Sequence, residues 1–149
     1  MLLTLLVTDA VADAADGGVL VPIEAFVRAS NAGDRAAVIA AFTTDSTIVD
    51  EYAPFLFSAP HAAAKWYDGS GPDQTSHGVT DAHSSIAAPK LVTVAGTRAY
   101  VVVPSVYAFK VHGKPAKETG LMACTLVRRG TQWKISSMAW AKLTDTSIP

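Results

Sequence analysis

The order of elements that the sequence predicts is that of an α+β domain. Apolar residues repeat at helical spacing in the first half of the chain, glycine, proline and aspartate break that half into short segments, and the part after about residue 78 has the pattern of β-strands. Helices that precede a run of antiparallel strands pack against one face of the sheet. We therefore expect three helices on a curved, mostly antiparallel sheet, plus an extra N-terminal helical segment.

Local signals place the three helices. The first is expected to begin near Pro22, because proline fits the first turn of a helix, and to end at Ala32-Gly33, a candidate left-handed cap. Asp34 then caps a short second helix. A third helix is expected from Pro60 through Tyr67, ended by the glycine, proline and aspartate residues at 68–73.

The strands follow from alternating polarity and from turn residues. A first strand is expected over Ser46–Tyr52, after a turn at 43–45 and before a loop at 54–58. Pro89 and Pro104 fall inside later strands and suggest bulges or edge positions. The later strands are expected at residues 79–94, 98–111, 117–129 and 132–143.

Turn lengths predict how the long strands pair. A two-residue loop at Gly113-Lys114 would place Val103 opposite Cys124, and a three-residue loop at 129–131 would place Met122 opposite Met138. One sheet face would then be apolar with a few polar groups, which suits either a small-molecule cavity or a plain hydrophobic core. That face would carry Val101, Val103, Ser105, Tyr107, Met122, Cys124, Leu126, Met138 and Trp140.

Residues 1–20 are expected to be an N-terminal extension of one domain at 21–149. The apolar start favours an extra helix over about residues 2–15, and a cleaved signal peptide is the alternative, although no basic residue precedes the apolar run. No stretch approaches the roughly 20 apolar residues of a membrane span, so no membrane partner is expected. A cytoplasmic location is favoured over a secreted or periplasmic one.

Composition excludes several function classes. The chain has 149 residues, 50% of them hydrophobic and 17% charged, which fits one globular domain. Its net charge is −1 and its basic residues are scattered, so no nucleic-acid partner is expected. The single cysteine, Cys124, rules out an internal disulfide, and without a nearby base it is expected to be a packed hydrophobe.

No metal and no cofactor are expected. The four histidines lack the spacing of a zinc site, and each is expected at the surface or in a loop. They are His61, His77, His83 and His112. Neither a glycine-rich phosphate loop nor a nucleophile elbow is present in the sequence.

Two stretches carry a resemblance to a known superfamily. Phe26–Asp34 reads as a helix followed by Asn-Ala-Gly-Asp, and Ala41–Asp50 reads as a helix end followed by a strand, with Ser136-Ser137-Met138 adding a weaker match in the last strand. From about Pro22 to Leu143 the chain resembles the nuclear transport factor 2-like superfamily, and in particular its SnoaL-like and ketosteroid-isomerase-like members. The resemblance implies a cystatin-like fold in which the three helices and the curved sheet form a cone with an internal pocket. These motifs are specific for the fold and not for a reaction.

The resemblance implies a role for Asp50. Ketosteroid isomerases keep an aspartate base at this position and hold the enolate oxygen with a tyrosine and a protonated aspartic acid. The matching donor positions here carry Phe26, which has no hydroxyl, and Cys124, a weak donor. The base is kept and both oxyanion donors are lost, each of which supplies on the order of a few kcal/mol. Substitute hydroxyls are available at Tyr52, Tyr107 and Ser105.

Two functions of different classes remain open at this point, so the sequence does not establish that the chain is an enzyme. The first is a small-molecule-binding domain with isomerase- or cyclase-type proton transfer on an apolar ligand, in which Asp50 is the general base. The second is a non-catalytic ligand-binding or oligomerisation module in which Asp50 has a structural role. The ligand contacts expected in the first case are Phe26, Tyr52, Trp66, Tyr107, Met122, Cys124, Met138 and Trp140.

Two further expectations concern the sheet. Strand alternation should place Asp50 and Tyr52 on one side and Glu51 on the other, which excludes a pair of adjacent carboxyl groups in one site. The outer face of the sheet, with Val102 and Val106, is expected to form a homodimer.

Overall fold

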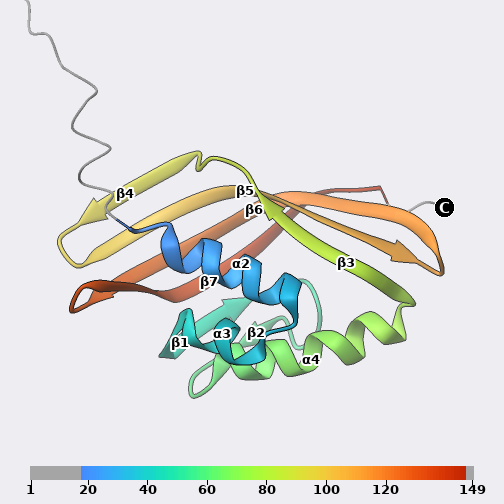
Figure 1. Cartoon of the computed structure of the whole chain (residues 1–149), viewed down its shortest axis with the longest axis horizontal. Coiled ribbons are helices and arrows are strands. Elements are labelled where there is room, and N and C mark those ends of the chain that lie inside the picture. The colour runs from blue at the N-terminus through green and yellow to red at the C-terminus, as the bar shows by residue number, and fades with distance from the viewer. Residues whose placement is uncertain (1–17, 147–149) are drawn as a thin grey trace, which may run out of the picture.

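The computed structural model describes residues 18–146, and the N-terminal helix expected at 2–15 lies outside them. Three helices lie on one side of a single seven-stranded sheet (Figure 1). The helices are α2 (Val21–Ala32), α3 (Arg35–Ala40) and α4 (Ala62–Ser76). The strands are β1 (Phe42–Val49), β2 (Leu56–Phe57), β3 (Val79–Ile86), β4 (Leu91–Ala95), β5 (Arg98–Val111), β6 (Lys114–Arg129) and β7 (Gln132–Asp145).

The sheet is mixed but mostly antiparallel, which confirms the predicted fold class. Its strand order is β2-β1-β7-β6-β5-β3, with β4 also pairing with β5. Among the strand pairs of residues 18–146, only β1–β7 is parallel. In the described part of the chain, no helix is both long and apolar enough to cross a membrane.

The hydrophobic core lies between the helices and the inner face of the sheet. Fully buried side chains come from α2, α3, β1, β6 and β7, and each contributes about 1.5–3 kcal/mol by leaving water. Ile23, Val38, Ile48, Leu126 and Ile135 have no exposed surface.

The predicted helix caps are confirmed. Gly33 ends α2 in the left-handed conformation, with a φ of 69°, which glycine adopts without strain. The Asp34 side chain then accepts a hydrogen bond of 3.0 Å from the backbone N–H of Ala37 and so begins α3.

The predicted end of the third helix is wrong, because α4 continues through residues 68–73 to Ser76. Its inward positions Trp66, Ser70 and Asp73, followed by the capping residue His77, recur at helical spacing and line a cavity. Because several of these residues are polar, the apolar periodicity that normally marks a helix is absent. Glycine at 69 has a packing reason, since a Cβ there would lie only 3.3 Å from the Tyr52 hydroxyl oxygen.

The first strand also differs from its prediction. β1 begins at Phe42, so residues 43–45 are strand and not turn, and it ends at Val49, before Asp50. The chain then turns back on itself, with the Asp50 N–H donating to the carbonyl of Phe55 (3.0 Å) and the Phe55 N–H to that of Tyr52 (2.9 Å). Residues 50–52 therefore do not follow the side-chain alternation of a strand.

The two prolines mark a break at one edge of the sheet. The strand expected at 79–94 is split at Pro89 into β3 and β4, both of which pair with β5. Pro104 of β5 faces this break, where its carbonyl accepts from the Ala87 N–H (3.0 Å). The N–H and C=O of one strand residue point to the same side, so the N–H that Pro104 lacks would have pointed toward the break and not toward β6. The proline therefore removes no hydrogen bond between β5 and β6.

The inward face of the long strands matches the prediction, although the register does not. Val101 lies opposite Cys124 and Val103 opposite Met122, because the β5–β6 loop is His112-Gly113. Met122 lies opposite Trp140, because the β6–β7 loop is the two residues Gly130-Thr131 and the register shifts once more between Thr125 and Leu126. The observed β5–β6 register differs from the predicted one by two residues. Because side chains alternate between the two faces of a strand, a difference of an even number leaves the same side chains facing inward.

Gly120 permits a close approach between β6 and β7, and a Gly120→Ala substitution tests it. A Cβ there would overlap the carbonyl oxygen of Ala141 and lie 2.8 Å from the Trp140 ring. We expect a loss of about 3 kcal/mol in the free energy of unfolding, measured by urea denaturation. Gly96→Ala, in an exposed turn with open space around it, should cost only about 1 kcal/mol of backbone strain. Equal losses would contradict the packing role of Gly120.

Candidate functional site

A half-open cavity of about 760 Å³ lies between the helices and the inner face of the sheet. Its walls come from α2, α4, the turn after β1, and strands β3, β5, β6 and β7. Phe26, Met122 and Met138 contribute apolar surface, whereas Asp50, Glu51 and Glu118 contribute carboxyl groups.

Most of the predicted ligand contacts lie on this wall. The cavity is lined by Phe26, Tyr52, Trp66, Tyr107, Met122, Met138 and Trp140. Cys124 is the exception, because its side chain is fully buried in the core and is not part of the wall. Burial raises the pKa of its thiol to about 12, so the thiol stays protonated and packs as a small hydrophobe.

Asp50 lies on the cavity wall with both oxygens oriented by hydrogen bonds. Its Oδ2 accepts from the indole Nε1–H of Trp66 (2.7 Å), and its Oδ1 accepts from the backbone N–H of Glu51 (2.6 Å). Burial raises the pKa of the Asp50 carboxyl above its ordinary value, and the two hydrogen bonds oppose part of this rise. The result is a fixed carboxylate of increased basicity that faces the cavity.

The expectation that Glu51 points away from Asp50 is wrong. Because β1 ends at Val49, the turn that follows brings both carboxyl groups to the same cavity. The indole Nε1–H of Trp140 donates to Glu51 Oε1 (3.0 Å), as that of Trp66 donates to Asp50. Two tryptophans, one on α4 and one on β7, therefore hold two consecutive carboxylates.

A group of charged residues that sequence reasoning missed lies beside Glu51. The ammonium group of Lys142 contacts the carboxylate of Glu51, Glu118 Oε1 at 3.2 Å and Asp145 Oδ2 at 3.5 Å. Glu118 lies on the same face of β6 as Met122, and Lys142 on the same face of β7 as Trp140, because every second residue of a strand points to the same side. This alternation is the sequence signal that could have placed both residues at the cavity.

The two glutamates of this group ionise differently. Burial, together with its hydrogen bond to Glu51 and the charge of Glu51, raises the pKa of Glu118 to about 7. Burial also opposes ionisation of Glu51, but hydrogen bonds from Glu118, Lys142 and Trp140 outweigh it and lower the Glu51 pKa. Below about pH 7 the pair therefore shares one proton, which resides mainly on Glu118.

Of the three substitute hydroxyls, two are engaged in the structure. Tyr52 donates to the backbone carbonyl of Trp66, and Ser105 donates to that of Ser85 (3.1 Å). Tyr107 faces the cavity, and burial and the nearby Glu118 raise its pKa to about 12. Among the residues described, the Tyr107 hydroxyl makes no hydrogen bond, so it is the hydroxyl available to a ligand.

Two of the histidines contribute to the cavity although they are exposed. His77 at the end of α4 and His83 on β3 both line it. The Nδ1 of His77 lies 3.7 Å from Asp73 Oδ2 on the preceding helical turn. Their exposure agrees with the predicted surface positions, whereas their place beside the cavity was not predicted.

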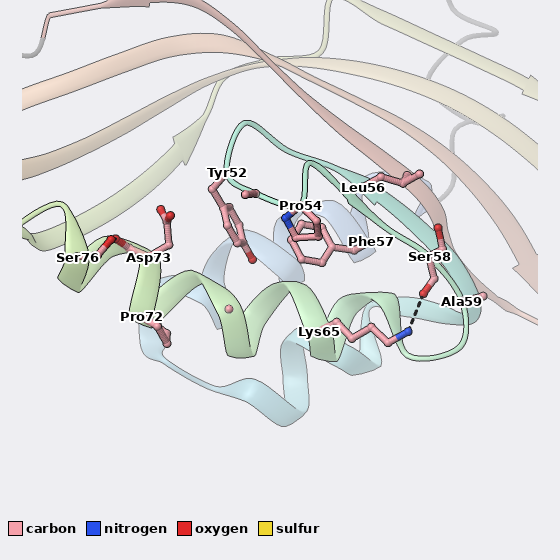
Figure 2. Close-up of a pocket in the computed structure, with 12 residues that line it drawn as sticks. Tyr52, Pro54, Leu56, Phe57, Ser58, Ala59, Lys65, Pro72, Asp73 and Ser76 are labelled. Atoms are coloured by element: carbon pink, nitrogen blue, oxygen red, sulfur yellow. Dashed lines mark hydrogen bonds between the residues drawn. The ribbon is translucent and has the colours of Figure 1, made fainter.

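A second hollow of about 710 Å³ lies on the other side of the 52–59 loop, against α4 (Figure 2). Tyr52, Ala53 and Asp73 line both cavities. Figure 2 shows Lys65 of α4 reaching the loop, where its ammonium group donates to the Ser58 carbonyl (3.2 Å). Because Asp50 and Glu118 do not line this hollow, we take the larger cavity as the candidate site.

The raised Glu118 pKa can be measured directly. We expect the side-chain carbon of Glu118 to titrate in NMR spectra with a midpoint near pH 7, in place of the ordinary 4.5. Because the folded protein binds the Glu118 proton more tightly than the unfolded chain does, this proton stabilises the fold fully at pH values below the unfolded pKa of 4.5. The stabilisation is lost as the pH rises through 7. Wild type should therefore lose stability between pH 4.5 and 7 relative to Glu118→Gln. A midpoint near 4.5 would contradict the shared proton.

Neither a protein-family model nor a curated protein matches this sequence. Solved structures do match over most of its length. The hexachlorocyclohexane dehydrochlorinase LinA-type3 from Novosphingobium barchaimii is 11% identical, with 93% of each chain covered and a TM-score of 0.76. A scytalone dehydratase-like protein from Novosphingobium aromaticivorans is 15% identical, with 95% of this chain and 93% of that chain covered and a TM-score of 0.74.

A ketosteroid isomerase-like protein from Erwinia carotovora atroseptica is 18% identical, with 86% of this chain and 95% of that chain covered and a TM-score of 0.68. At these identities the likeness concerns the backbone. The chain has the nuclear transport factor 2-like cone fold that its sequence pattern predicts.

Proposed function

We propose that the protein binds a flat, mainly apolar small molecule and transfers a proton on it, with Asp50 as the general base. The observation that carries this proposal is a carboxylate of raised pKa on the wall of an open cavity, with both oxygens oriented by hydrogen bonds. A base is most effective when its pKa approaches the working pH, and burial shifts Asp50 in that direction.

The geometry supports proton transfer in two ways. The Asp50 oxygens accept hydrogen bonds from Trp66 and from the backbone of Glu51, and a carboxylate has enough lone pairs to take a proton from the ligand as well. The aromatic side chains of Phe26, Trp66 and Trp140 supply flat surfaces against which a ring system can be held in one orientation.

The names of the structural neighbours agree with this type of chemistry. They describe a dehydrochlorinase, a dehydratase-like and an isomerase-like protein. Eliminations and isomerisations both include the removal of a proton from carbon, which is the step we assign to Asp50. A non-catalytic ligand-binding module would use the same cavity without this step.

Asp50→Asn separates the two functions. We expect wild type to accelerate hydrogen–deuterium exchange at the methyl group of flat two-ring compounds in D₂O, followed by NMR. The variant should lose about 100-fold or more of that acceleration, because an amide is not a base, while ligand binding measured by tryptophan fluorescence changes little. The matched control is Asp68→Asn, which removes a carboxylate paired with Arg35 outside the cavity. Equal exchange rates in Asp50→Asn and wild type would favour the binding module.

We also propose that a second copy of the chain covers the outer face of the sheet. One row of residues paired across the strands is apolar from edge to edge, and its two outermost members, Leu91 and Leu56, are about half exposed. The row runs Leu91, Val102, Ala123, Ala139, Val49 and Leu56. An apolar surface of this extent favours association.

Size-exclusion chromatography with light scattering tests the homodimer. We expect a dimer at micromolar concentration that Val102→Glu converts to a monomer, because a charge buried within an apolar interface loses its water. Val21→Glu, at a residue 60% exposed on α2, should leave the dimer intact. A monomeric wild type would refute the proposal.

A further inference from the structure

The cavity concentrates negative charge. Five carboxyl groups line it, against one lysine, Lys142, and no arginine among the described residues. The carboxyl groups are those of Asp50, Glu51, Asp73, Glu118 and Asp145. The whole chain carries a net charge of only −1, so this excess belongs to the site and not to the molecule as a whole.

The arrangement of these groups indicates what kind of cation they would attract. In residues 18–146, no three His, Cys, Asp or Glu side chains converge closely enough to hold a metal ion. The carboxyl groups are instead distributed around a cavity whose walls include Phe26, Trp66, Tyr107 and Trp140. Aromatic faces attract organic cations, and carboxylates around them add to that attraction.

The same charges disfavour an anionic intermediate. Proton removal beside a neutral carbonyl creates an enolate, which needs hydrogen-bond donors for its oxygen. Phe26 has no hydroxyl, the Cys124 thiol lies in the core, and the Tyr52 hydroxyl is engaged by the Trp66 carbonyl. The Tyr107 and Ser30 hydroxyls remain as donors, but an enolate would form among several carboxylates, whose negative charge opposes it.

We propose that the ligand of this cavity is a flat organic cation whose positive nitrogen is conjugated with the C–H bond that Asp50 breaks, as in an iminium or N-alkylated ring ion. This inference rests on the proposed function of Asp50. It explains why a site that has a base, and that carries Phe26 and Cys124 at the two donor positions of the ketosteroid isomerases, is surrounded by carboxyl groups.

The chemical step then needs no anion. Asp50 takes the proton from carbon, the C–H electron pair becomes a C=C bond, and the former C=N π pair moves onto nitrogen. The product of this step is a neutral enamine and a protonated Asp50. Return of the proton to the same or to a conjugated carbon restores the cation, so atoms and charge balance without an oxidant, reductant or co-reactant.

Three probes of similar size and different charge test the ligand class. They are the 1,2-dimethylquinolinium cation, neutral 2-acetylnaphthalene and the 2-naphthoate anion. By tryptophan fluorescence at low salt and pH 8, we expect the cation to bind about 10-fold or more tightly than the ketone, with no binding of the anion. This preference should shrink as salt increases, because screening weakens charge attraction.

In D₂O, wild type should exchange the C2-methyl hydrogens of the cation faster than the methyl hydrogens of the ketone, relative to buffer.

A matched pair of variants tests the source of the preference. Glu118→Gln removes one cavity charge at pH 8 and should weaken binding of the cation by about 5-fold, a typical effect of one nearby charge, with little change for the ketone. Asp81→Asn removes a carboxylate that pairs with Lys110 outside the cavity and should change neither. The salt dependence of wild type is an independent readout that does not require the variants to fold.

Proton linkage gives one more readout. At pH 7 Glu118 faces Glu51 from the turn after β1, Lys142 and Asp145 from β7, and Tyr107 from β5. A bound cation should favour its ionised form, so calorimetry in buffers of different ionisation enthalpy should detect proton release in wild type and less in Glu118→Gln.

The outcomes separate this inference from the proposed function. If the ketone binds more tightly than the cation and exchanges faster in an Asp50-dependent way, the inference of a cationic ligand is wrong and the role of Asp50 as base stands. Preferential binding of the cation without Asp50-dependent exchange supports the ligand class and overturns the proton transfer. If no probe binds, or if all bind equally at every salt concentration, the inference fails.

Discussion

The end of β1 at Val49 is the constraint on which the site depends. Had the strand continued as alternation predicts, Asp50 and Glu51 would point to opposite faces of the sheet, and only one carboxyl group would enter the cavity. The turn at residues 50–55 instead presents both, and it is held by backbone hydrogen bonds between Asp50 and Phe55 and between Phe55 and Tyr52. Tryptophans from α4 and β7 then fix the two carboxylates from opposite sides.

The same turn connects the site to the rest of the fold. The hydroxyl of Tyr52 donates to the Trp66 carbonyl, and the indole of Trp66 donates to Asp50, so the turn and α4 are joined at two points. Gly69 permits this approach because a side chain there would crowd the Tyr52 hydroxyl. The long α4, with its polar inner face, is thus better explained by the site it lines than by its contribution to the core.

Sequence reasoning located what depends on apolar patterning and missed what depends on the turn. The fold class, the caps at Gly33 and Asp34, and the inward face of β5, β6 and β7 are predictable because burial and backbone conformation leave a local signal. Trp66, Trp140 and Asp50 were identified through aromatic character and resemblance. The extent of α4, the position of Glu51 and the Lys142 group were not, because polar residues that face a cavity resemble polar residues that face solvent. Glu118 shows the difficulty most clearly, since only its place in the alternating set of β6 distinguished it from a surface glutamate.

The charge around the cavity is costly to the folded state, and that cost is itself informative. Glu51, Glu118 and Asp145 meet around a single lysine, which partly desolvates them and makes them repel one another. Glu118 relieves part of this repulsion by being protonated below about pH 7. A protein under selection for stability alone would replace some of these side chains by neutral or apolar ones of similar volume. Charged groups that cost stability are expected at an open aromatic cavity when they help to bind a ligand. Binding sites are the places where a fold tolerates interactions that do not stabilise the folded state. The surplus of carboxyl groups over cationic ones around the aromatic cavity therefore says more about the ligand than the presence of Asp50 does.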